Sequence, residues 1–559
     1  MSQSSASPPS VARSAPAATE QAESERVEPF VVPDLLHLVP RPGFDAEGVQ
    51  ELLELSFLGR EAADDLDAVL GAESGGWDLD SFAHDLFVRD LIREQFAVVA
   101  GGMRFPPREQ FLFQVLSAPP VDAAEVRFRQ AILRELEDDE DLAERAHDLY
   151  REVFRLLDMF KAPDHAAQLD LDAHRLDIFR QAKTVIDRMA GDFGAARSGL
   201  ARLGEAGAAM QATRQYRRLA DLLEHEGRAA TVTVDVAVGA DGEVKSLTLH
   251  AIREHRENPF HTPPWRRWLL RLRSALLGQR LDRKVILRRI LREVFHEVSP
   301  SLVPLVQVLG HLEVYLASCA FRQRMATLGL DTCLPEVVPE APVEAERLFN
   351  PLLAAVGTAP VPCDVVQESP RLTTLVTGPN SGGKTRLLQS LGLAQLLGQS
   401  GLWAPAARAR LPLVRGLFVS LVEQETAAQA EGRLGREMLR IRRLFERTGS
   451  PSMVILDELC SGTNPSEGVE IFDLVLRLLE RLGAVAFVST HFLEHARHLR
   501  DARPVARLDF LRVATDDDLR STYQFVDGVA ETSLAAETAR RLGVTFDDLA
   551  ALIDRRDST

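Results

Sequence analysis

Eight residues rich in glycine carry the clearest chemical signal in this sequence. Residues 378–385 read Gly-Pro-Asn-Ser-Gly-Gly-Lys-Thr and complete the pattern G-x-x-x-x-G-K-[ST]. In this pattern backbone N–H groups surround a β-phosphate, the lysine reaches the β- and γ-phosphates, and the threonine hydroxyl is a ligand of Mg²⁺. The alternative is a glycine-rich turn without a ligand, which its place between a strand and a helix disfavours. The pattern predicts nucleotide binding by Gly378, Pro379, Asn380, Ser381, Gly382, Gly383, Lys384 and Thr385.

Two adjacent carboxylates and one histidine complete the set of candidate catalytic residues. Asp457 and Glu458 directly follow the apolar run 453–456. The aspartate would hold Mg²⁺ together with Thr385, and the glutamate would orient or deprotonate an attacking water. His491 follows a further apolar run, where its imidazole can sense a γ-phosphate, although a lone histidine more often has a structural role. We therefore expect ATP and Mg²⁺ as cofactors, with Glu458 and His491 as catalytic residues and Thr385 and Asp457 as metal ligands.

These motifs need strands whose carboxyl ends meet at one edge of a sheet. Residues 372–376, 453–456 and 484–488 are short apolar runs that end in turn or polar residues and lead toward helical segments. That alternation is typical of buried parallel strands covered by helices. A proline-rich connector at residues 334–342 precedes it. The pattern predicts an α/β P-loop NTPase domain over residues 336–559, ending in a C-terminal helical segment.

Upstream of the connector, apolar residues recur mostly at helical spacing. One such stripe consists of Leu176, Phe179, Ile186 and Met189. Residues 231–238 and 244–250 instead alternate around an Asp-Gly turn, which predicts a β-hairpin. The expected fold class is multidomain, with a mainly α-helical region ahead of the α/β domain. The expected boundaries are a disordered tail at 1–28, a small helical region at 29–104, and a helical domain at 105–335 with a hairpin and arginine-rich insertion at about 230–292.

A basic segment stands out in an otherwise acidic chain. Arginine and lysine side chains crowd the residues between Trp265 and Glu293, where only Asp282 carries a negative charge before the final glutamate. The apolar residues keep helical spacing, so the segment is either the solvated face of amphipathic helices or a surface that contacts phosphates. A role at a membrane surface ranks third. The DNA-binding candidates are Arg280, Arg283, Lys284, Arg288 and Arg289.

Composition limits the classes of protein that this chain can represent. Its 559 residues are 45% hydrophobic and 26% charged, which is typical of a folded multidomain protein. The 65 basic and 82 acidic residues give a net charge of −17, so DNA would have to bind a local basic patch. The four cysteines have no partners at zinc spacing, and the N-terminus lacks the apolar stretch of a signal peptide. Polar residues interrupt the apolar stretch 302–320, so we expect no membrane partner and a cytoplasmic location.

Taken together, the motifs resemble the MutS family of DNA mismatch repair ATPases. The family's loop reads TGPN-x-GGKS, and residues 377–385 read TGPNSGGKT. GLWAPA, DELCSGTNPSEG, STHF and a closing segment from Asp527 to Val544 follow in the family's order. Weaker likeness at residues 113–129 and 302–335 implies that residues 105–335 form the family's core and lever domain. The resemblance also implies an ABC-like MutS ATPase domain, a clamp driven by ATP, double-stranded or branched DNA as a partner, and a homodimer.

Departures from the family pattern shape the functional hypothesis. No aromatic-x-glutamate wedge precedes the core, so we expect no insertion into mismatches. In the loop at residues 423–438, Leu434 and Gly435 stand about where hydroxyls that face a partner subunit are expected, and residues 361–364 lack an adenine-stacking aromatic. The leading hypothesis is a MutS-like ATPase that switches a clamp on DNA, in repair or recombination, without classical mismatch reading.

Two alternatives come from other classes of protein. One is an ATP-binding scaffold that hydrolyses slowly or not at all and serves a repair or ribosome-associated partner, which the altered loop favours. The other is an ABC-type transport ATPase, for which the sequence offers neither a membrane partner nor an LSGGQ-like helix start.

Overall fold

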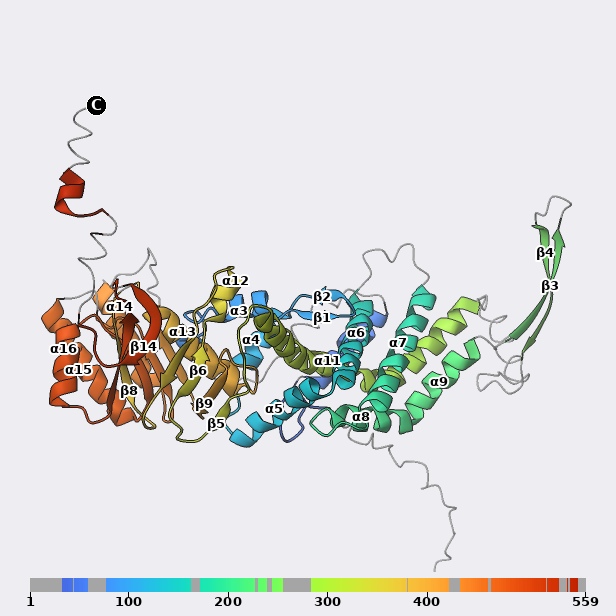
Figure 1. Ribbon diagram of the computed structural model, residues 1–559. Helices are drawn as coiled ribbons and strands as arrows, with labels where there is room; N and C mark the ends of the chain where they lie inside the picture. The colour runs from blue at the N-terminus through green and yellow to red at the C-terminus, as the bar shows by residue number, and fades with distance from the viewer. Residues whose placement is uncertain are drawn as a thin grey trace, which may run out of the picture. The chain divides into compact units, whose positions relative to one another are not determined.

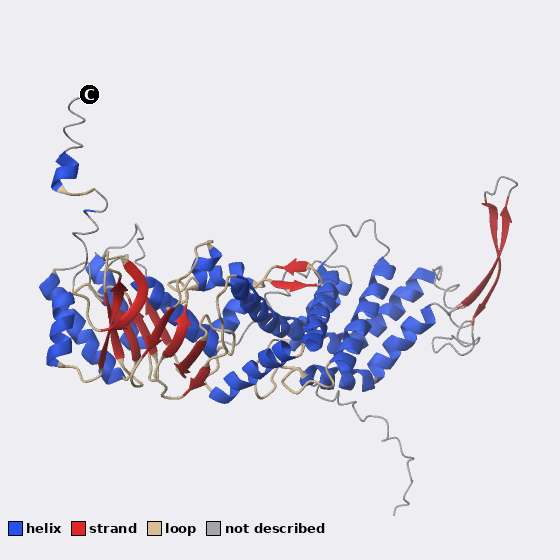
Figure 2. Cartoon of the chain, in the orientation of Figure 1, coloured by secondary structure: helices blue, strands red, loops and turns tan. Residues whose placement is uncertain are grey.

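The structure is a computed structural model in which most of the chain is described. The described residues are 33–43, 45–58, 77–161, 171–226, 230–238, 244–254, 283–379, 381–421, 433–460, 464–518, 520–531, 540 and 543–550. The tail expected at residues 1–28 lies outside them. Figure 1 labels many of the elements and colours the chain by residue number, and Figure 2 separates helices from strands.

Helices make up most of the described chain before residue 336 (Figure 2). They are α1 (Ala46–Phe57), the 3-10 helix η2 (Leu79–Ser81), α3 (Val88–Gln95), α4 (Glu109–Ser117), α5 (Ala123–Asp138), α6 (Glu140–Lys161), α7 (Leu171–Asp192), α8 (Ala201–Ala212), α9 (Arg214–Glu226) and α11 (Arg283–Thr327). The long α11 contacts α1, α6, α7 and α9. Its Phe295 ring stacks on Phe57 with ring centroids 3.8 Å apart. The predicted helical character of this part is confirmed.

Local sequence signals set helix ends and helix spacing in this part. α1 and α5 each begin after an aspartate, Asp45 and Asp122, whose side chain accepts a hydrogen bond from the N–H two residues further on. α7 and α8 approach each other closely at Gly207, where a Cβ atom would lie 2.4 Å from the backbone nitrogen of Ala190. The close approach of these two helices therefore requires glycine at position 207, in addition to the apolar contacts between them.

In the described part of this region, two hairpins interrupt the helices. β1 (Val98–Ala100) and β2 (Met103–Phe105) pair antiparallel inside the region predicted to be helical. Gly101 and Gly102 form their turn with φ angles of +58° and +77°, and strands of three residues are too short for alternation to reveal. β3 (Ala230–Val238) and β4 (Val244–Glu254) pair antiparallel where alternation predicts a hairpin.

Beyond residue 335 the described residues form two sheets. The larger sheet has the order β10-β11-β12-β8-β13-β14, in which β14 alone runs antiparallel to its neighbour. The smaller sheet has the order β5-β9-β6-β7. The strands are β5 (Glu336–Val338), β6 (Glu344–Leu348), β7 (Cys363–Val366), β8 (Thr373–Thr377), β9 (Arg408–Pro412), β10 (Leu417–Ser420), β11 (Met453–Leu456), β12 (Val485–Ser489), β13 (Leu508–Thr515) and β14 (Ser521–Asp527). The three apolar runs form β8, β11 and β12, which are parallel and buried along their whole length, as predicted.

The helices of this part are α12 (Pro351–Ala355), α13 (Lys384–Gln399), α14 (Arg433–Arg447), α15 (Pro465–Leu482) and α16 (Leu493–Ala502). In α13 every residue except Thr385 and Arg386 is buried. This helix contacts β6 and β9 of the smaller sheet and β11 and β12 of the larger one. The chain is thus multidomain, with a mainly helical part followed by a mixed α/β part.

Among the helices that the structure describes, one is long and apolar enough to cross a membrane, by length and composition alone. The stretch Leu291–Thr327 of α11 is long and apolar enough to span a bilayer, but 94% of its most apolar window is buried inside the protein. Glu313 within it is fully buried and accepts a hydrogen bond from the backbone N–H of Arg108 at 2.6 Å. A buried helix with a paired carboxylate is the central helix of a folded core.

Candidate nucleotide and metal site

The glycine-rich loop joins the carboxyl end of β8 to the amino end of α13. Gly378 and Gly383 have φ angles of +144° and +86°, in the region that favours glycine. A Cβ atom on Gly378 would lie 2.6 Å from a methyl carbon of Val513, so only glycine fits there. The amino end of α13 therefore directs free backbone N–H groups and its positive dipole end at the loop. Asn380 lies outside the described residues.

Lys384 is held inside the loop that it terminates. The residue is 3% exposed, and its ammonium group donates to the carbonyl oxygens of Gly378 at 3.1 Å and Pro379 at 3.2 Å. Its Nζ atom also lies 3.5 Å from Oε1 of Glu458. A buried ammonium is thus fixed at the centre of the loop, next to the candidate catalytic carboxylate.

Asp457 gathers two hydroxyl groups at the carboxyl end of β11. Thr385 Oγ1 donates to Asp457 Oδ2, and Ser489 Oγ donates to Asp457 Oδ1. Ser489 Oγ also accepts from the N–H of Glu458 at 2.8 Å. Burial raises the pKa of Asp457, while the hydrogen bonds from Ser489 and Thr385 lower it. The structure therefore brings the two predicted metal ligands together and adds Ser489, whose role the sequence did not reveal.

The donor set fits Mg²⁺ bound together with phosphates. In the described part of the chain, no three His, Cys, Asp or Glu side chains gather as a metal cage. The oxygens of Thr385 and Asp457 instead lie side by side at the end of the loop. Mg²⁺ prefers oxygen ligands and is usually held by one or two protein groups plus water and substrate phosphates. These two residues suit that mode of binding.

Glu458 and His491 both lie at strand ends near the loop. Glu458 is one-third exposed and adopts a φ angle of +45°, a left-handed backbone that is unusual for a residue with a side chain. His491 is exposed, and its ring packs on Phe492 with centroids 4.2 Å apart. Partial desolvation of the imidazole lowers the pKa of His491, an effect that Glu458 opposes and Lys384 reinforces. Both predicted residues thus lie close enough to Lys384 to share its electrostatic field.

Tyr523 is an aromatic residue beside the loop that sequence reasoning missed. A Cβ atom on Gly383 would lie 3.1 Å from Cδ1 of its ring, and the residue is 46% exposed. Its neighbour Ser521 donates to the carbonyl oxygen of Gly382 at 3.4 Å. Tyr523 belongs to β14, which only the strand order β8-β13-β14 brings to the loop. No signal in the linear sequence marks it.

The residues predicted to bind DNA lie just before α11 and in its first turns. Arg280 lies outside the described residues, and Arg283, Lys284, Arg288 and Arg289 belong to the first turns of α11, where only the backbone is described. Of the loop at residues 423–438, the part from 433 onward is described and belongs to α14.

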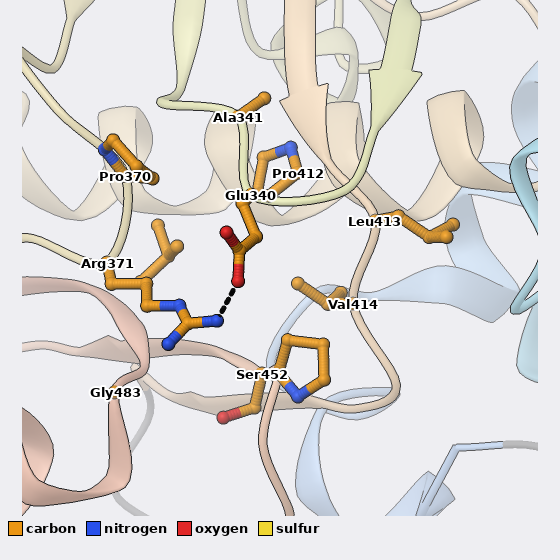
Figure 3. Close-up of a pocket in the computed structure, with 11 residues that line it drawn as sticks. Glu340, Ala341, Pro370, Arg371, Pro412, Leu413, Val414, Ser452 and Gly483 are labelled. Carbon is orange, nitrogen blue, oxygen red and sulfur yellow. Dashed lines mark hydrogen bonds and ion pairs between the residues drawn. The ribbon is translucent and has the colours of Figure 1, made fainter.

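Figure 3 shows a small cavity, which lies at the amino ends of strands whose carboxyl ends face the loop. It is lined by residues that precede β8, β11 and β12, including Arg371, Ser452 and Gly483. An ion pair between Arg371 and Glu340 crosses it. The cavity leaves about 20 Å³ for the centre of a water-sized molecule. That volume is enough for about one water and far too small for a nucleotide. The cavity is therefore not an alternative nucleotide site to residues 378–385.

A known protein family matches the part of the chain that contains this site. Residues 374–547 match the family MutS domain V. The protein named Endonuclease MutS2 of Streptococcus gordonii is 31% identical over 288 residues, which cover 50% of this chain and 35% of that protein.

Proteins of the same name from two further organisms give similar matches. The one from Pelotomaculum thermopropionicum is 31% identical over 264 residues, covering 46% of this chain and 32% of the relative. The one from Symbiobacterium thermophilum is 31% identical over 276 residues, covering 49% and 33%. The chain therefore matches about a third of the length of these relatives.

Proposed function

Because the C-terminal part of this chain is MutS-related, we propose that the protein is a DNA-binding ATPase of MutS type. The observation that carries the proposal is the joining of Thr385, Asp457 and Ser489 by hydrogen bonds beside the Lys384–Glu458 contact. These side chains come from β8–α13, β11 and β12, and their convergence supports the proposal of a P-loop NTPase site. We propose no nuclease activity, since that word belongs to the name of relatives matched over a third of their length.

Each residue has a role in this proposal. The N–H groups of the loop and the Lys384 ammonium would bind the β- and γ-phosphates, and Thr385 with Asp457 would hold Mg²⁺. Bound Mg²⁺ supplies positive charge that offsets the charge developing on the phosphates. Glu458 would orient the attacking water and accept a proton from it. His491 would donate a hydrogen bond toward the γ-phosphate.

The wider proposal is a homodimeric clamp on DNA, in the cytoplasm, that acts in repair or recombination without reading mismatches. It draws on the MutS-related part and on the basic residues at the start of α11. The four cysteines are free, which suits a reducing compartment.

Steady-state ATP hydrolysis at fixed salt tests this proposal. The purified chain is assayed alone and with homoduplex, mismatched, branched and single-stranded DNA and with structured RNA. We expect DNA to change the rate of turnover. Lys384→Ala should abolish both nucleotide binding and turnover. Glu458→Gln should lower turnover about 10²-fold or more while ATP still binds. Turnover that Glu458→Gln leaves intact would remove Glu458 from its role.

Absence of turnover with ATP binding retained would favour the second candidate, an ATP-binding scaffold for a repair or ribosome-associated protein. Gly435, which stands near the position where a hydroxyl would face a partner, supports that candidate. A preference for mismatched DNA would contradict the expectation that the chain carries no mismatch wedge.

A further inference from the structure

The turn that carries Glu458 has an unusual backbone. Glu458 and Cys460 have φ angles of +45° and +61°, although both carry side chains. A residue with a side chain in this left-handed region is sterically strained, so such a turn persists only where its surroundings fix it. The position of the Glu458 carboxylate therefore depends on the groups that hold this turn.

Two side chains hold the turn, one at each end. Ser489 accepts from the N–H of Glu458 at 2.8 Å. Glu437 of α14 accepts from the N–H of Cys460 through its Oε1 atom. A carboxylate that accepts a backbone N–H makes a stronger hydrogen bond than a neutral acceptor does. Glu437 is thus the charged anchor of the turn, 21 residues before Glu458 in the chain.

The helix α14 is itself held in place by a residue on the same helix face as Glu437. Arg440 lies one helical turn beyond Glu437, and its guanidinium donates to Asp85 Oδ2 and, at 3.2 Å, to the carbonyl oxygen of Val419. The side chain of Asp85 is 2% exposed and also accepts from the N–H of Leu421 at 2.7 Å. Asp85 therefore ties α14 to the end of β10.

Asp85 comes from residues 77–95, far from the α/β part in sequence, and this segment packs on the edge of the larger sheet. Ser81 Oγ donates to the carbonyl oxygen of Leu417 at 2.7 Å, and Gln389 of α13 donates to the carbonyl oxygen of Asp85 at 3.4 Å. Leu86 lies against α13, where a Cβ atom on Gly392 would approach its side chain to 2.7 Å.

We propose that Glu437 is a positioning residue for Glu458, and that Asp85 supports it through Arg440, so that residues 77–95 form part of the hydrolytic site's framework. The inference rests on the proposed ATPase function. Glu437 touches neither nucleotide nor water in this account; it fixes the turn from which the Glu458 carboxylate projects.

The test measures amide hydrogen exchange at residues 457–460 and ATP turnover in the full chain. Glu437→Ala should speed exchange at the turn and lower kcat about tenfold or more, with the KM for ATP changed by less than about twofold, because the loop at residues 378–385 is untouched. Glu437→Gln keeps an acceptor and should retain at least about a third of the native kcat. Glu437→Asp, which keeps the charge but loses reach, should resemble the alanine variant.

Matched controls separate this role from a loss of folding. Glu446→Ala removes a carboxylate of the same helix that pairs with Arg442, and it should change neither readout. Asp85→Asn should move both readouts in the same direction as Glu437→Ala by a smaller factor, whereas Asp90→Asn, at an exposed pair with Arg93 within α3, should not.

Unchanged exchange at residues 457–460 in Glu437→Ala would overturn the proposal, as would a raised KM with normal kcat. If the native chain shows no turnover that depends on Glu458, the proposed ATPase function fails instead. The exchange measurement then still decides whether Glu437 holds the turn.

Discussion

Thr385 and Asp457 are separated by 72 residues, yet their side chains are hydrogen bonded to each other. The pair joins the first turn of α13 to the end of β11, and Ser489 at the end of β12 completes it. Three adjacent elements thus place three oxygen-bearing side chains within one hydrogen-bonded group. A metal that binds there meets ligands already oriented, so little side-chain ordering would accompany binding.

Asp457→Asn tests the cost of the buried carboxylate. Burial raises the pKa of this group above its ordinary 3.8, so the unfolded chain releases the proton first and the carboxylate weakens folding as pH rises above that value. At pH 7 the variant should melt about 1–3 °C higher without ligand, and it should lose the further stabilisation given by Mg²⁺ with ATP. Thermal melts at pH 7 and pH 4 measure both effects, and the gain should shrink at the lower pH.

Asp527→Asn is the matched control, since Asp527 is exposed on β14. A fall in melting temperature of the ligand-free Asp457→Asn variant would mean that its hydrogen bonds outweigh the burial of charge.

Tyr523→Ala tests whether the ring beside Gly383 contacts the nucleotide base. Stacking of a base on an aromatic ring contributes about 1–3 kcal/mol, and this ring is half exposed, so we expect ATP affinity to fall about 5- to 10-fold. Tyr523→Phe should bind normally, and Val526→Ala on the same strand serves as the control. Calorimetric titration with ATP measures the dissociation constants; equal values for Tyr523→Ala and the native chain would exclude the contact.

We expect the buried His311 to make the helical part sensitive to acid. Burial lowers the pKa of His311 from 6.5 to about 3, and its Nδ1 atom accepts from the N–H of Leu35 at 3.0 Å. Because the unfolded chain takes up the proton below pH 6.5 and the folded chain does not, the free energy of unfolding should fall with pH, by at most about 1.4 kcal/mol per unit. Denaturant unfolding at pH 7 and pH 5 measures this slope.

His311→Gln keeps an acceptor without the titration and should flatten the slope. His296→Gln, at an exposed histidine of the same helix, should not change it. The same slope in the native chain and in His311→Gln would assign the acid sensitivity to other groups.

Neutralising Arg283, Lys284, Arg288 and Arg289 together tests the proposed binding of DNA at the start of α11. For each DNA phosphate that the variant no longer neutralises, the slope of log affinity against log salt should become shallower by about 0.9. Affinity for duplex DNA is measured from about 50 to 300 mM salt, a range over which this dependence is large, with Arg442→Gln on α14 as the control. An unchanged slope would identify the segment as the solvated face of a helix.

The parts of the fold that the sequence predicted are those with strong local patterns. The run at residues 453–456 became β11 with the same limits, and the alternation at 231–250 became the β3–β4 hairpin. The smaller sheet went unpredicted, because a strand such as β6, with the sequence Glu-Ala-Glu-Arg-Leu, shows no clean apolar alternation.

In the candidate site, the residues predicted were those embedded in contiguous motifs. Tyr523, Glu437 and Asp85 were not, because each reaches the site through a different element and no local pattern marks it. Their positions follow from strand order and helix packing, which are set by contacts distant in sequence.

The near-complete burial of α13 limits how the molecule can respond to a ligand. A helix enclosed by two sheets and by Leu86 cannot slide or rotate without opening voids on one side and forcing overlaps on the other. α13 is then a stationary axis for the elements that pack around it. Any movement on nucleotide binding would therefore involve the elements around α13 and not a displacement of α13 itself.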